Sequence, residues 1–380
     1  RDGYLAENER LGTQGLRVMA TGQKDFDPTS FDPDADLLPL LDGMTLLAMV
    51  GIVDPPRPAA KAAIATAHAA GIQVRMITGD HAVTAEAIAR RLGLEGRAMT
   101  GADFRALSDD EAMRQIDGIG VLARVSPEDK VHLVDILRQK GHVVAMTGDG
   151  VNDAPALKQA DIGIAMGITG TEVSKQAAVM ILTDDNFGTI VKAVGLGRNV
   201  YDNLLRFIRF QMAGLFGFIA TFLGSSLLNI LGGIPFLPLQ TMWLNFTVNV
   251  FQAIGLGYGK PREGLMEVPP RPKGQPIIPR RLMGWLVLVG LVMAAGTLGV
   301  LAWGSNQYGD VVARTMGMTT FALFRLFSSL ETADEDESLF SGSILGNRPL
   351  LLATGLSALT ILLAVEFGFL QRLLGTTSLT

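Results

Sequence analysis

The chain has 380 residues with a net charge of −5, and 48% of the residues are hydrophobic, a high share for a soluble protein. Acidic and basic side chains number 27 and 20 in residues 1–200, but only 10 and 12 in residues 201–380. This uneven charge predicts a water-soluble first half joined to a membrane-embedded second half. The acidic balance excludes nucleic acid as a partner, and the lack of cysteine excludes disulfides, thiolate metal sites and thiol nucleophiles.

The start of the chain carries no targeting signal. Residues 1–23 are polar and lack an apolar core followed by a small-residue cleavage site, so they do not form a signal peptide. The chain does not begin with methionine, and it has an odd number of predicted membrane spans with no tail after Thr380. We therefore expect it to be an internal fragment of a longer protein.

The first half alternates apolar, β-rich runs with turns and helical patterns. Predicted strands lie at residues 73–77, 120–125, 143–146 and 162–165. A predicted helix follows each of the first three strands: the first helix ends at Leu92, the second ends at Gln139, and the third begins at Ala154. This repeated order of strand, loop and helix predicts a Rossmann-like α/β fold, a parallel sheet with helices on its faces. In such folds, ligands bind beyond the carboxyl ends of the strands.

The side chains at these strand ends suit phosphate chemistry. Thr78 and glycine-flanked backbone amides are donors for phosphate oxygens, and Lys130 adds a positive charge. Asp149 and Asp153, four residues apart in a glycine-containing loop, suit Mg²⁺, which prefers hard oxygen ligands and keeps part of its hydration. No nucleophile is visible in this set. The phosphoryl acceptor is therefore expected to be water, the substrate or a residue outside the chain.

These residues also have structural interpretations. A lone Thr-Gly-Asp caps a helix more often than it binds phosphate, because Thr and Asp satisfy free helix amides. A lone lysine is usually solvated. The position of Thr78 after an apolar strand, and of Lys130 in a Pro-x-Asp-Lys sequence before an apolar helix, favour the functional interpretation. The histidines show no paired metal spacing and are predicted surface or capping residues: His68, His81, His132 and His142.

The second half contains long apolar runs. Residues 210–259 carry no charge, and because a membrane span needs roughly 20 residues, this run predicts two helices with a turn at residues 232–238. The loop at residues 260–281 has six basic and two acidic residues, which predicts that this loop and the soluble half face the cytoplasm. Five spans are predicted in all, at residues 208–231, 236–258, 283–304, 311–330 and 349–369.

Three polar residues in the second predicted span lie on one helix face, since Asn245, Asn249 and Gln252 are spaced by four and three. Such a stripe either marks an ion site or joins helices by hydrogen bonds worth ~0.6 to 2 kcal/mol each, and both interpretations stay open. Arg325 lies about a turn and a half from the inner end of its span. We expect its side chain to reach the membrane surface, without a role in ion binding.

Four motifs follow one another along the first half: Asp54-Pro55-Pro56-Arg57, Met76-Ile77-Thr78-Gly79-Asp80, Ala123-Arg124-Val125 with Asp129-Lys130, and Met146-Thr147-Gly148-Asp149-Gly150-Val151-Asn152-Asp153-Ala154-Pro155-Ala156-Leu157. They resemble the P-type cation-transporting ATPases, most closely the calcium- and sodium-pump branch. The resemblance continues through Asp184-Asp185-Asn186-Phe187 and Trp243-Leu244-Asn245 and weakens after about Gly304. It implies ATP-driven cation transport through an aspartyl-phosphate, with ATP as substrate, Mg²⁺ as cofactor, and a multi-pass protein of the cell membrane in contact with a cation and the lipid bilayer.

The resemblance also implies a division into domains and a set of residue roles. Residues 1–43 correspond to the end of a nucleotide-binding domain, 44–203 to a haloacid-dehalogenase-like phosphorylation domain with a stalk helix, and 204–380 to an all-α transmembrane bundle. The resemblance assigns Mg²⁺ binding to Asp149 and a supporting role to Asp153. Contact with the phosphoryl group or support of its loop is expected of Thr78, Gly79, Asp80, Lys130 and Asn152. Nucleotide binding, or a place in the hinge below the nucleotide-binding domain, is expected of Arg17, Asp54, Arg57 and Arg124.

The sequence departs from these pumps at the transport site. The expected amide and carboxylate of the fifth span fall on Leu215 and Phe218, and the expected acidic position of the sixth falls on Asn249, after Val248. The phosphorylated Asp-Lys-Thr-Gly-Thr motif, the actuator domain and the first four spans are absent, so this chain by itself is expected neither to autophosphorylate nor to transport. Two alternatives stay open: a pump relative without cation coupling that acts as a lipid or regulatory ATPase, and a membrane-anchored phosphatase.

Overall fold

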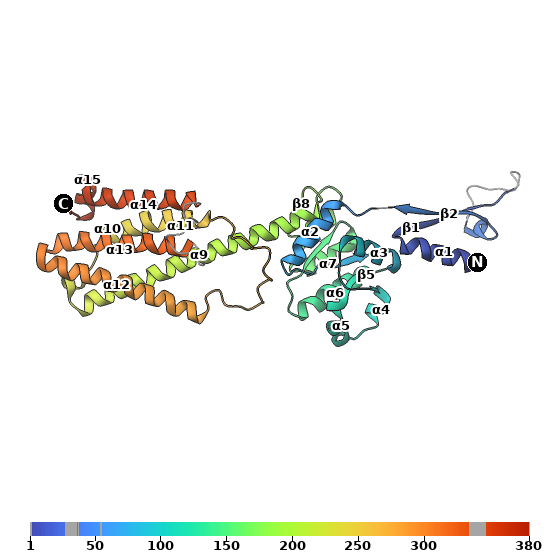
Figure 1. Cartoon of the computed structure of the whole chain (residues 1–380), viewed down its shortest axis with the longest axis horizontal. Coiled ribbons are helices and arrows are strands. Elements are labelled where there is room, and N and C mark those ends of the chain that lie inside the picture. The colour runs from blue at the N-terminus through green and yellow to red at the C-terminus, as the bar shows by residue number, and fades with distance from the viewer. Residues whose placement is uncertain (1, 27–35, 37, 54, 334–346, 380) are drawn as a thin grey trace. The chain divides into compact units, whose positions relative to one another are not determined.

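The structure is a computed structural model that describes residues 2–26, 36, 38–53, 55–333 and 347–379. The chain divides into two compact units (Figure 1). The first unit comprises Arg1–Val194 with Met266–Lys273, and the second comprises Gly195–Leu265 with Gly274–Thr380. The predicted domain boundary at residues 203/204 lies within the second unit, near its start.

Two three-stranded parallel sheets form the centre of the first unit. One has the order β3 (Met76–Thr78), β5 (Ile119–Ala123), β4 (Arg97–Thr100), and the other has the order β6 (Ala145–Gly148), β7 (Ile162–Met166), β8 (Met180–Leu182). Within the described residues, β3 pairs only with β5 and β6 only with β7, so each keeps one free edge. The predicted α/β fold is confirmed, although the strands form two sheets where the sequence predicted one.

Helices follow these strands at the predicted places. The helix predicted to end at Leu92 is α3 (Ala82–Leu92), and Gly93 ends it with a φ of +80° that favours glycine. The helix predicted to end at Gln139 is α6 (Pro127–Gln139), where Ser126 and Asp129 form a capping box and proline takes the first helical position. The others are α2 (Pro58–Ala69), α4 (Gly101–Arg105), α5 (Asp109–Gln115), η2 (Ile116–Gly118), η3 (Val151–Asp153), α7 (Ala154–Gln159) and α8 (Glu172–Ala177).

A separate antiparallel pair lies at the start of the first unit. Strand β1 (Leu16–Gln23) follows α1 (Asp2–Thr13), and it pairs with β2 (Thr45–Val53), which follows η1 (Leu38–Leu41). The register runs from Leu16 opposite Val53 to Gln23 opposite Thr45. The predicted boundary at residues 43/44 therefore falls between two strands that pair with each other.

The core of the first unit lies between the sheets and α6. Leu133, Val134, Ile136 and Leu137 of α6 pack with Leu122 of β5 in a cluster that also includes the fully buried Phe104 and Ile116. Ile77 of β3 contacts this cluster and also the cluster formed by Met146, Ala156 and Leu157. One side chain of β3 therefore links the two sheets through shared apolar packing.

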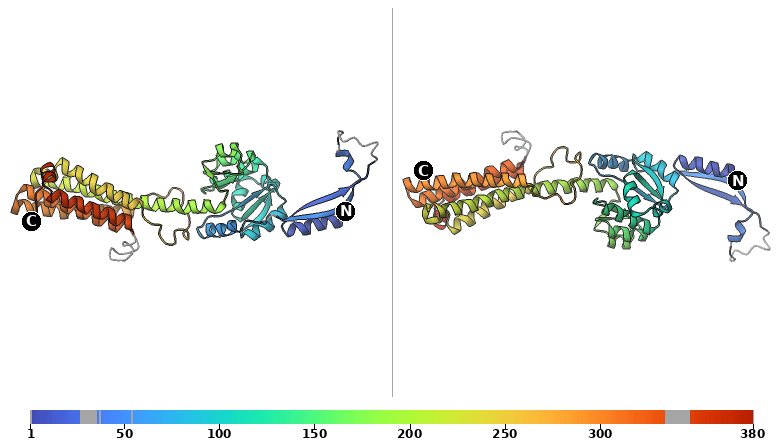
Figure 2. Two further views of the ribbon diagram at one scale, coloured as in Figure 1. Left: turned by 90° about the horizontal axis from the view of Figure 1, so that it is seen from above. Right: turned by 90° about the horizontal axis from the view of Figure 1, so that it is seen from below.

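The second unit is helical, and its helices run alongside one another in both views of Figure 2. Helix α9 (Phe187–Leu227) is a single helix of 41 residues that starts in the first unit and continues into the second. The helices after it are η4 (Ile230–Gly233), α10 (Pro238–Trp243), the π-helical segment η5 (Leu244–Asn249), α11 (Val250–Gly257), α12 (Arg280–Tyr308), α13 (Asp310–Ala333), α14 (Arg348–Glu366) and α15 (Gly368–Leu374).

Three described helices, α9, α12 and α14, are long and apolar enough to cross a membrane. The second predicted span corresponds to α10, η5 and α11, which divide residues 238–257 into short segments, and the fourth corresponds to α13, which carries Arg314 and Arg325. The prediction of five spans is not tested by these lengths and stays a prediction. The core of this unit includes Phe236, Leu244, Val248, Met318 and Phe321, all nearly or fully buried.

Candidate functional site

The first predicted group lies at the carboxyl end of β3. The Thr78 hydroxyl donates to Asp80 Oδ2 at 3.2 Å, and the Asp80 N–H donates back to Thr78 Oγ1 at 3.1 Å, which closes Thr78-Gly79-Asp80 into a tight turn. The cap of α3 is the following residue, His81, whose Nδ1 accepts from the Val83 N–H. His81 thus has the predicted capping role. Because α3 begins only after His81, Thr78 and Asp80 lie outside the helix, at the carboxyl end of β3.

The turn after β5 lies against this group. The Arg124 N–H donates to the Asp80 carbonyl at 3.2 Å, and the Val125 N–H donates to the Thr78 carbonyl at 3.4 Å. Arg124 reaches this geometry with a φ of +52°, a conformation that few residues other than glycine adopt. Its side chain is exposed. The loops that follow β3 and β5 are therefore held together by their backbones.

The loop after β6 is organised around Asp153. This carboxylate is 7% exposed, and it accepts from Lys130 Nζ at 2.6 Å and from the N–H groups of Gly150 and Asp149 at 3.0 and 3.2 Å. Burial by itself would raise the pKa of Asp153, but the hydrogen bonds from Lys130 and the backbone outweigh burial and lower it. Asp153 is thus an anchor for the loop, and α6 and β6 are joined through Lys130.

Asp149 is held only by its backbone. Its carbonyl accepts from the Thr171 N–H at 2.8 Å and from the Ser174 hydroxyl at 3.1 Å, whereas its side chain is exposed and accepts no hydrogen bond from the described residues. Asn152 is exposed in η3, three residues along the same loop. The structure therefore fixes the position of Asp149 and leaves its carboxylate open to a ligand.

The loop around Asp149 can supply one carboxylate ligand to Mg²⁺, but it does not supply a complete set of protein ligands. The described residues contain no group of three or more His, Cys, Asp or Glu side chains placed to hold a metal ion. Proteins commonly bind Mg²⁺ through one or two carboxylates, with waters and substrate phosphates completing an octahedron. The free carboxylate of Asp149 fits that pattern, whereas Asp153 is already engaged with Lys130.

Two further predicted arginines lie elsewhere in the first unit. Arg57 Nη1 donates to the Asp185 carbonyl at 3.2 Å, and the Asp185 carboxylate accepts from the N–H groups of residues 167–169. Burial acts to raise the pKa of Asp185, but these bonds lower it to about 2. Arg17 is exposed on β1, in the separate antiparallel pair. Asp54 lies outside the described residues.

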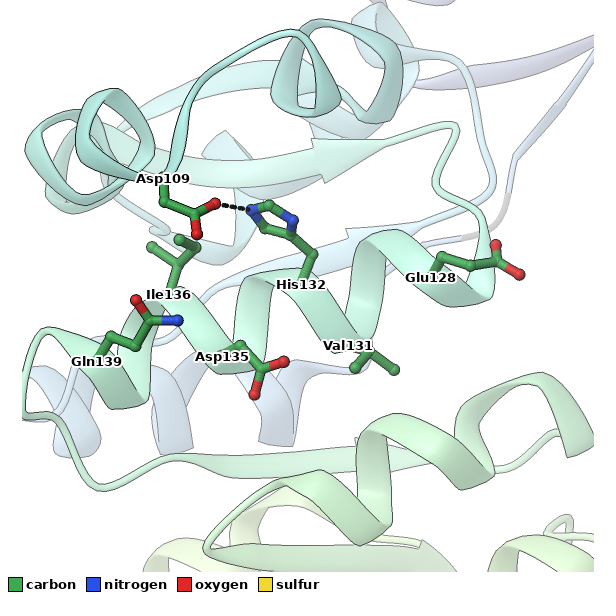
Figure 3. Close-up of a pocket in the computed structure, with 7 residues that line it drawn as sticks. All are labelled: Asp109, Glu128, Val131, His132, Asp135, Ile136 and Gln139. Atoms are coloured by element: carbon green, nitrogen blue, oxygen red, sulfur yellow. Dashed lines mark ion pairs between the residues drawn. The ribbon is translucent and has the colours of Figure 1, made fainter.

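A cavity of about 340 Å³ in the first unit contains none of the predicted site residues (Figure 3). It lies along α6, and His132 faces Asp109 across it at 3.5 Å while its ring meets Phe104 edge to face. The His132 side chain is 34% exposed, so it lies at the surface as predicted, and α5 brings Asp109 against it. An imidazole and a carboxylate at this distance form an ordinary ion pair when the histidine is protonated.

The polar stripe of the second unit is divided between two environments. Asn245 and Asn249 line a cavity of about 440 Å³, and Asn249 Nδ2 donates to Asn245 Oδ1 at 2.7 Å. Gln252 is fully buried, donates to Ser357 and accepts from Ser329 and Thr354, on α14 and α13. The helix-joining interpretation fits Gln252, whereas the two asparagines face open volume.

The positions of the fifth span where an amide and a carboxylate were expected hold apolar side chains. Leu215 and Phe218 of α9 both line it. The Phe218 ring lies 4.4 Å from the Phe321 ring and 6.1 Å from the Phe236 ring, centre to centre. Aromatic packing therefore fills the position where the sequence comparison with pumps expected a carboxylate.

Arg325 is the residue that sequence reasoning placed wrongly. Its side chain is 2% exposed and points into the helix bundle, where it lines the same cavity as Asn249. The signal was its charge within an otherwise apolar segment, which marks a functional position by default. Sequence reasoning also missed Gln211 in the cavity, Thr171 and Ser174 behind Asp149, and Asp185 as the anchor of residues 167–169.

Comparison with known proteins finds one matching family model in each half of the chain. Residues 5–161 match the haloacid dehalogenase-like hydrolases, and residues 233–380 match the family described as cation transporting ATPase, C-terminus. A probable cation-transporting ATPase F of Mycobacterium tuberculosis is 41% identical over 93% of this chain and 40% of its own length. A calcium-transporting ATPase of Bacillus subtilis is 37% identical over 97% of this chain and 42% of its own length.

A human calcium-transporting ATPase type 2C member 1 is 35% identical over the whole of this chain and 40% of its own length. The chain thus spans about two fifths of the length of the curated relatives that it matches. The resemblance to cation-transporting ATPases that the motifs indicated is confirmed. So is the fold class, a haloacid-dehalogenase-like domain followed by a helical membrane region.

Proposed function

We propose, from its likeness to the hydrolase and membrane regions of P-type cation-transporting ATPases, that this chain is part of an ATP-driven cation pump that works through an aspartyl-phosphate. The observation that carries the proposal is the loop after β6. Lys130 and two backbone N–H groups hold Asp153, and the same loop presents the unpaired carboxylate of Asp149. A fixed cation and a free carboxylate at one strand end suit a phosphoryl group bound together with Mg²⁺.

Each residue of this loop and its neighbours has a role in the proposal. Asp149 would hold Mg²⁺, which when bound neutralises charge on phosphate oxygens. Lys130 stabilises negative charge on the transferring group, and Thr78 and Asn152 donate hydrogen bonds to its oxygens. Asp80 and Asp153 keep the two loops in place through the contacts described above. Arg17, Arg57 and Arg124 stay proposals for nucleotide binding or the hinge.

The free strand edges suggest where the phosphorylated aspartate lies. Strands β3 and β6 each have one unpaired edge among the described residues, and their carboxyl ends carry Thr78 and Asp149. Ile77 of β3 packs against the apolar cluster that includes Met146 of β6. We place the acceptor aspartate at the carboxyl end of a further parallel strand between them, supplied by a segment outside this chain.

Helix α9 would couple the phosphate to transport. It begins five residues after β8, at Phe187, and continues to Leu227 among the apolar helices of the second unit. A continuous helix transmits a displacement at one end to the other because its hydrogen-bonded turns resist compression. With the first unit in the cytoplasm, phosphorylation would alternate the helices between two conformations that bind the cargo differently.

The test is phosphoenzyme formation by the full-length protein. ATP should yield an acid-stable phosphoenzyme, and its level should be measured with calcium, sodium, potassium, manganese and protons in turn. Asp149→Ala should reduce it about 100-fold or more, because a group that stabilises transferring charge is lost. Asp110→Ala, an exposed aspartate on α5, is the matched control. A normal phosphoenzyme in Asp149→Ala would refute the metal assignment, and a level that no ion changes would favour an ATPase without cation coupling.

A further inference from the structure

The cavity of the second unit already contains a positive charge. Its wall includes Gln211, Phe218, Thr241, Asn245, Asn249 and Arg325. Arg325 is 2% exposed, and its guanidinium plane lies over the Phe210 ring, 3.7 Å from the ring centre. The charged end of this side chain is therefore buried inside the helix bundle.

The guanidinium of Arg325 is hydrogen-bonded to the oxygens that a metal ion would need as ligands. Its Nη2 donates to Asn249 Oδ1 at 2.6 Å and to Gln211 Oε1 at 2.8 Å, its Nη1 donates to the Phe210 carbonyl at 2.5 Å, and its Nε also reaches Asn249 Oδ1. Hard cations enter a membrane site only when protein oxygens replace their water. The oxygens that Asn249, Gln211 and Phe210 offer for that purpose are already bound to Arg325.

The cavity also lacks negative charge. None of its lining residues among those that the structure describes is Asp or Glu. Arg325 is consequently balanced by neutral dipoles and an aromatic face alone. A divalent cation placed beside it would meet a like charge with no carboxylate between them, and at low effective dielectric that repulsion is strong. A carboxylate brought in by another segment would pair with the guanidinium, which is the nearest cation.

The backbone of α9 is shaped for this side chain. A Cβ on Gly214 would overlap Arg325 Nη1, so a glycine is needed where the guanidinium passes closest to the helix. The same helix provides the Phe210 carbonyl, the Phe210 ring and the Gln211 amide. Three residues of α9, Phe210, Gln211 and Gly214, thus fit a guanidinium from α13, which distinguishes this pocket from an incidental contact.

We propose that Arg325 is the resident cation of this cavity and excludes divalent metal ions from it. The inference rests on the proposed function, because it names the class of cargo that the pump rejects. Its guanidinium binds the Asn249 and Gln211 side-chain oxygens that a metal ion in this cavity would otherwise use. In this proposal, the contacts of the Arg325 guanidinium with α9 and η5 form or break as the helices move.

The first test is a binding measurement on the wild-type, full-length protein. Radioactive calcium and manganese at micromolar concentration, with magnesium in excess, should show no stoichiometric binding. Stoichiometric calcium binding that Asn249→Ala removes would overturn the proposal. This result does not depend on a phosphoenzyme. If ATP yields no phosphoenzyme in any ion, the proposed function fails while the binding result still decides the inference.

The second test separates charge from shape by chemical rescue. Arg325→Ala should lower ATP turnover about tenfold or more, because the groups that bound a buried charge lose it. Millimolar guanidinium should restore turnover, whereas urea, which has nearly the same shape but no charge, should not. Equal rescue by both, or unchanged turnover in the variant, would show that Arg325 only fills space. If Arg325→Ala does not fold, the calcium measurement on the wild-type protein decides.

Discussion

The two units hold a buried charge in opposite ways. In the first, the Asp153 carboxylate is met by the ammonium of Lys130 and two N–H groups, and the loop leaves a second carboxylate, Asp149, exposed. In the second, the guanidinium of Arg325 contacts neutral oxygens and the Phe210 ring, and it lines the cavity itself. In the proposed function the first site receives a cation together with a phosphate, whereas the cavity of the second unit already contains the positive charge of Arg325.

The largest expected effect comes from removing the cation of the first site. Lys130→Met leaves the Asp153 carboxylate buried without its charged partner, which should lower the free energy of unfolding by about 3 kcal/mol. Phosphoenzyme formation by the full-length protein should fall about 100-fold, because the charge on the transferring group is no longer stabilised. Thermal unfolding and phosphoenzyme yield measure the two effects.

The matched control for this variant is Lys158→Met, since Lys158 is exposed on the neighbouring helix α7. It should leave both quantities unchanged. A Lys130→Met protein with wild-type phosphoenzyme yield would show that Lys130 only anchors Asp153, and the two units would then differ less than the structure indicates.

A second variant disturbs the cation of the second site without removing its charge. Gly214→Ala places a methyl group against Arg325 Nη1, and overpacking of this kind costs about 1 to 3 kcal/mol. We expect lower thermal stability together with altered ATP turnover. Gly197→Ala, on the same helix but with open space around its Cβ, should have neither effect. If the two variants behave alike, the close fit between α9 and Arg325 has no functional meaning.

The first site could be predicted from the sequence because its chemistry is local. Thr78 and Asp149 each follow an apolar strand directly, and the turn residues, the Ser126 cap and Pro127 mark where the helices begin. Within each sheet, the parallel order of the strands places their carboxyl ends at one edge, and this can be predicted without any knowledge of long-range contacts. The division into two sheets could not be predicted, because it depends on the absence of pairing between β3 and β6.

The second site could not be predicted because its partners are distant in the sequence. Arg325 meets Phe210 and Gln211, more than 110 positions earlier, and Asn249, 76 positions earlier. Hydropathy and distance from the helix end place Arg325 at the membrane surface, whereas packing of α13 against α9 and η5 turns it inward. The separate environments of Asn249 and Gln252 likewise depend on which helix lies opposite each one.

A smaller effect should distinguish the two parts of the polar stripe. Gln252→Leu removes the hydrogen bonds that Gln252 makes with Ser329, Thr354 and Ser357, and hydrogen bonds between membrane helices are worth about 1 kcal/mol. Thermal stability should fall modestly while the ion response of the phosphoenzyme stays that of the wild type. Asn249→Leu, the matched change on the cavity wall, should alter that response. An altered ion response in Gln252→Leu would contradict the helix-joining role.

The smallest expected effect concerns Asp185, which anchors residues 167–169 of the first unit. Hydrogen bonds lower its pKa from the ordinary value of 3.8 to about 2 in the folded protein. The stabilisation is therefore fully present above pH 3.8 and is lost as the pH falls through about 2, because the unfolded chain takes up the proton first. Asp185→Asn should remove this pH dependence, so that the variant is less stable than the wild type at neutral pH and equal to it near pH 2.

Hydrogen exchange at the amides of Gly167, Ile168 and Thr169, followed from pH 7 downward in the full-length protein, measures the loss directly, since these three groups donate to Asp185. Glu172→Gln, an exposed change on the nearby helix α8, is the control and should leave their protection unchanged. Equal protection of these amides at neutral pH in the wild type and in Asp185→Asn would show that the charge of Asp185 does not hold the loop. Among the residues that the structure describes, the lining of the cavity in the second unit includes no such carboxylate, and its charged side chain is Arg325.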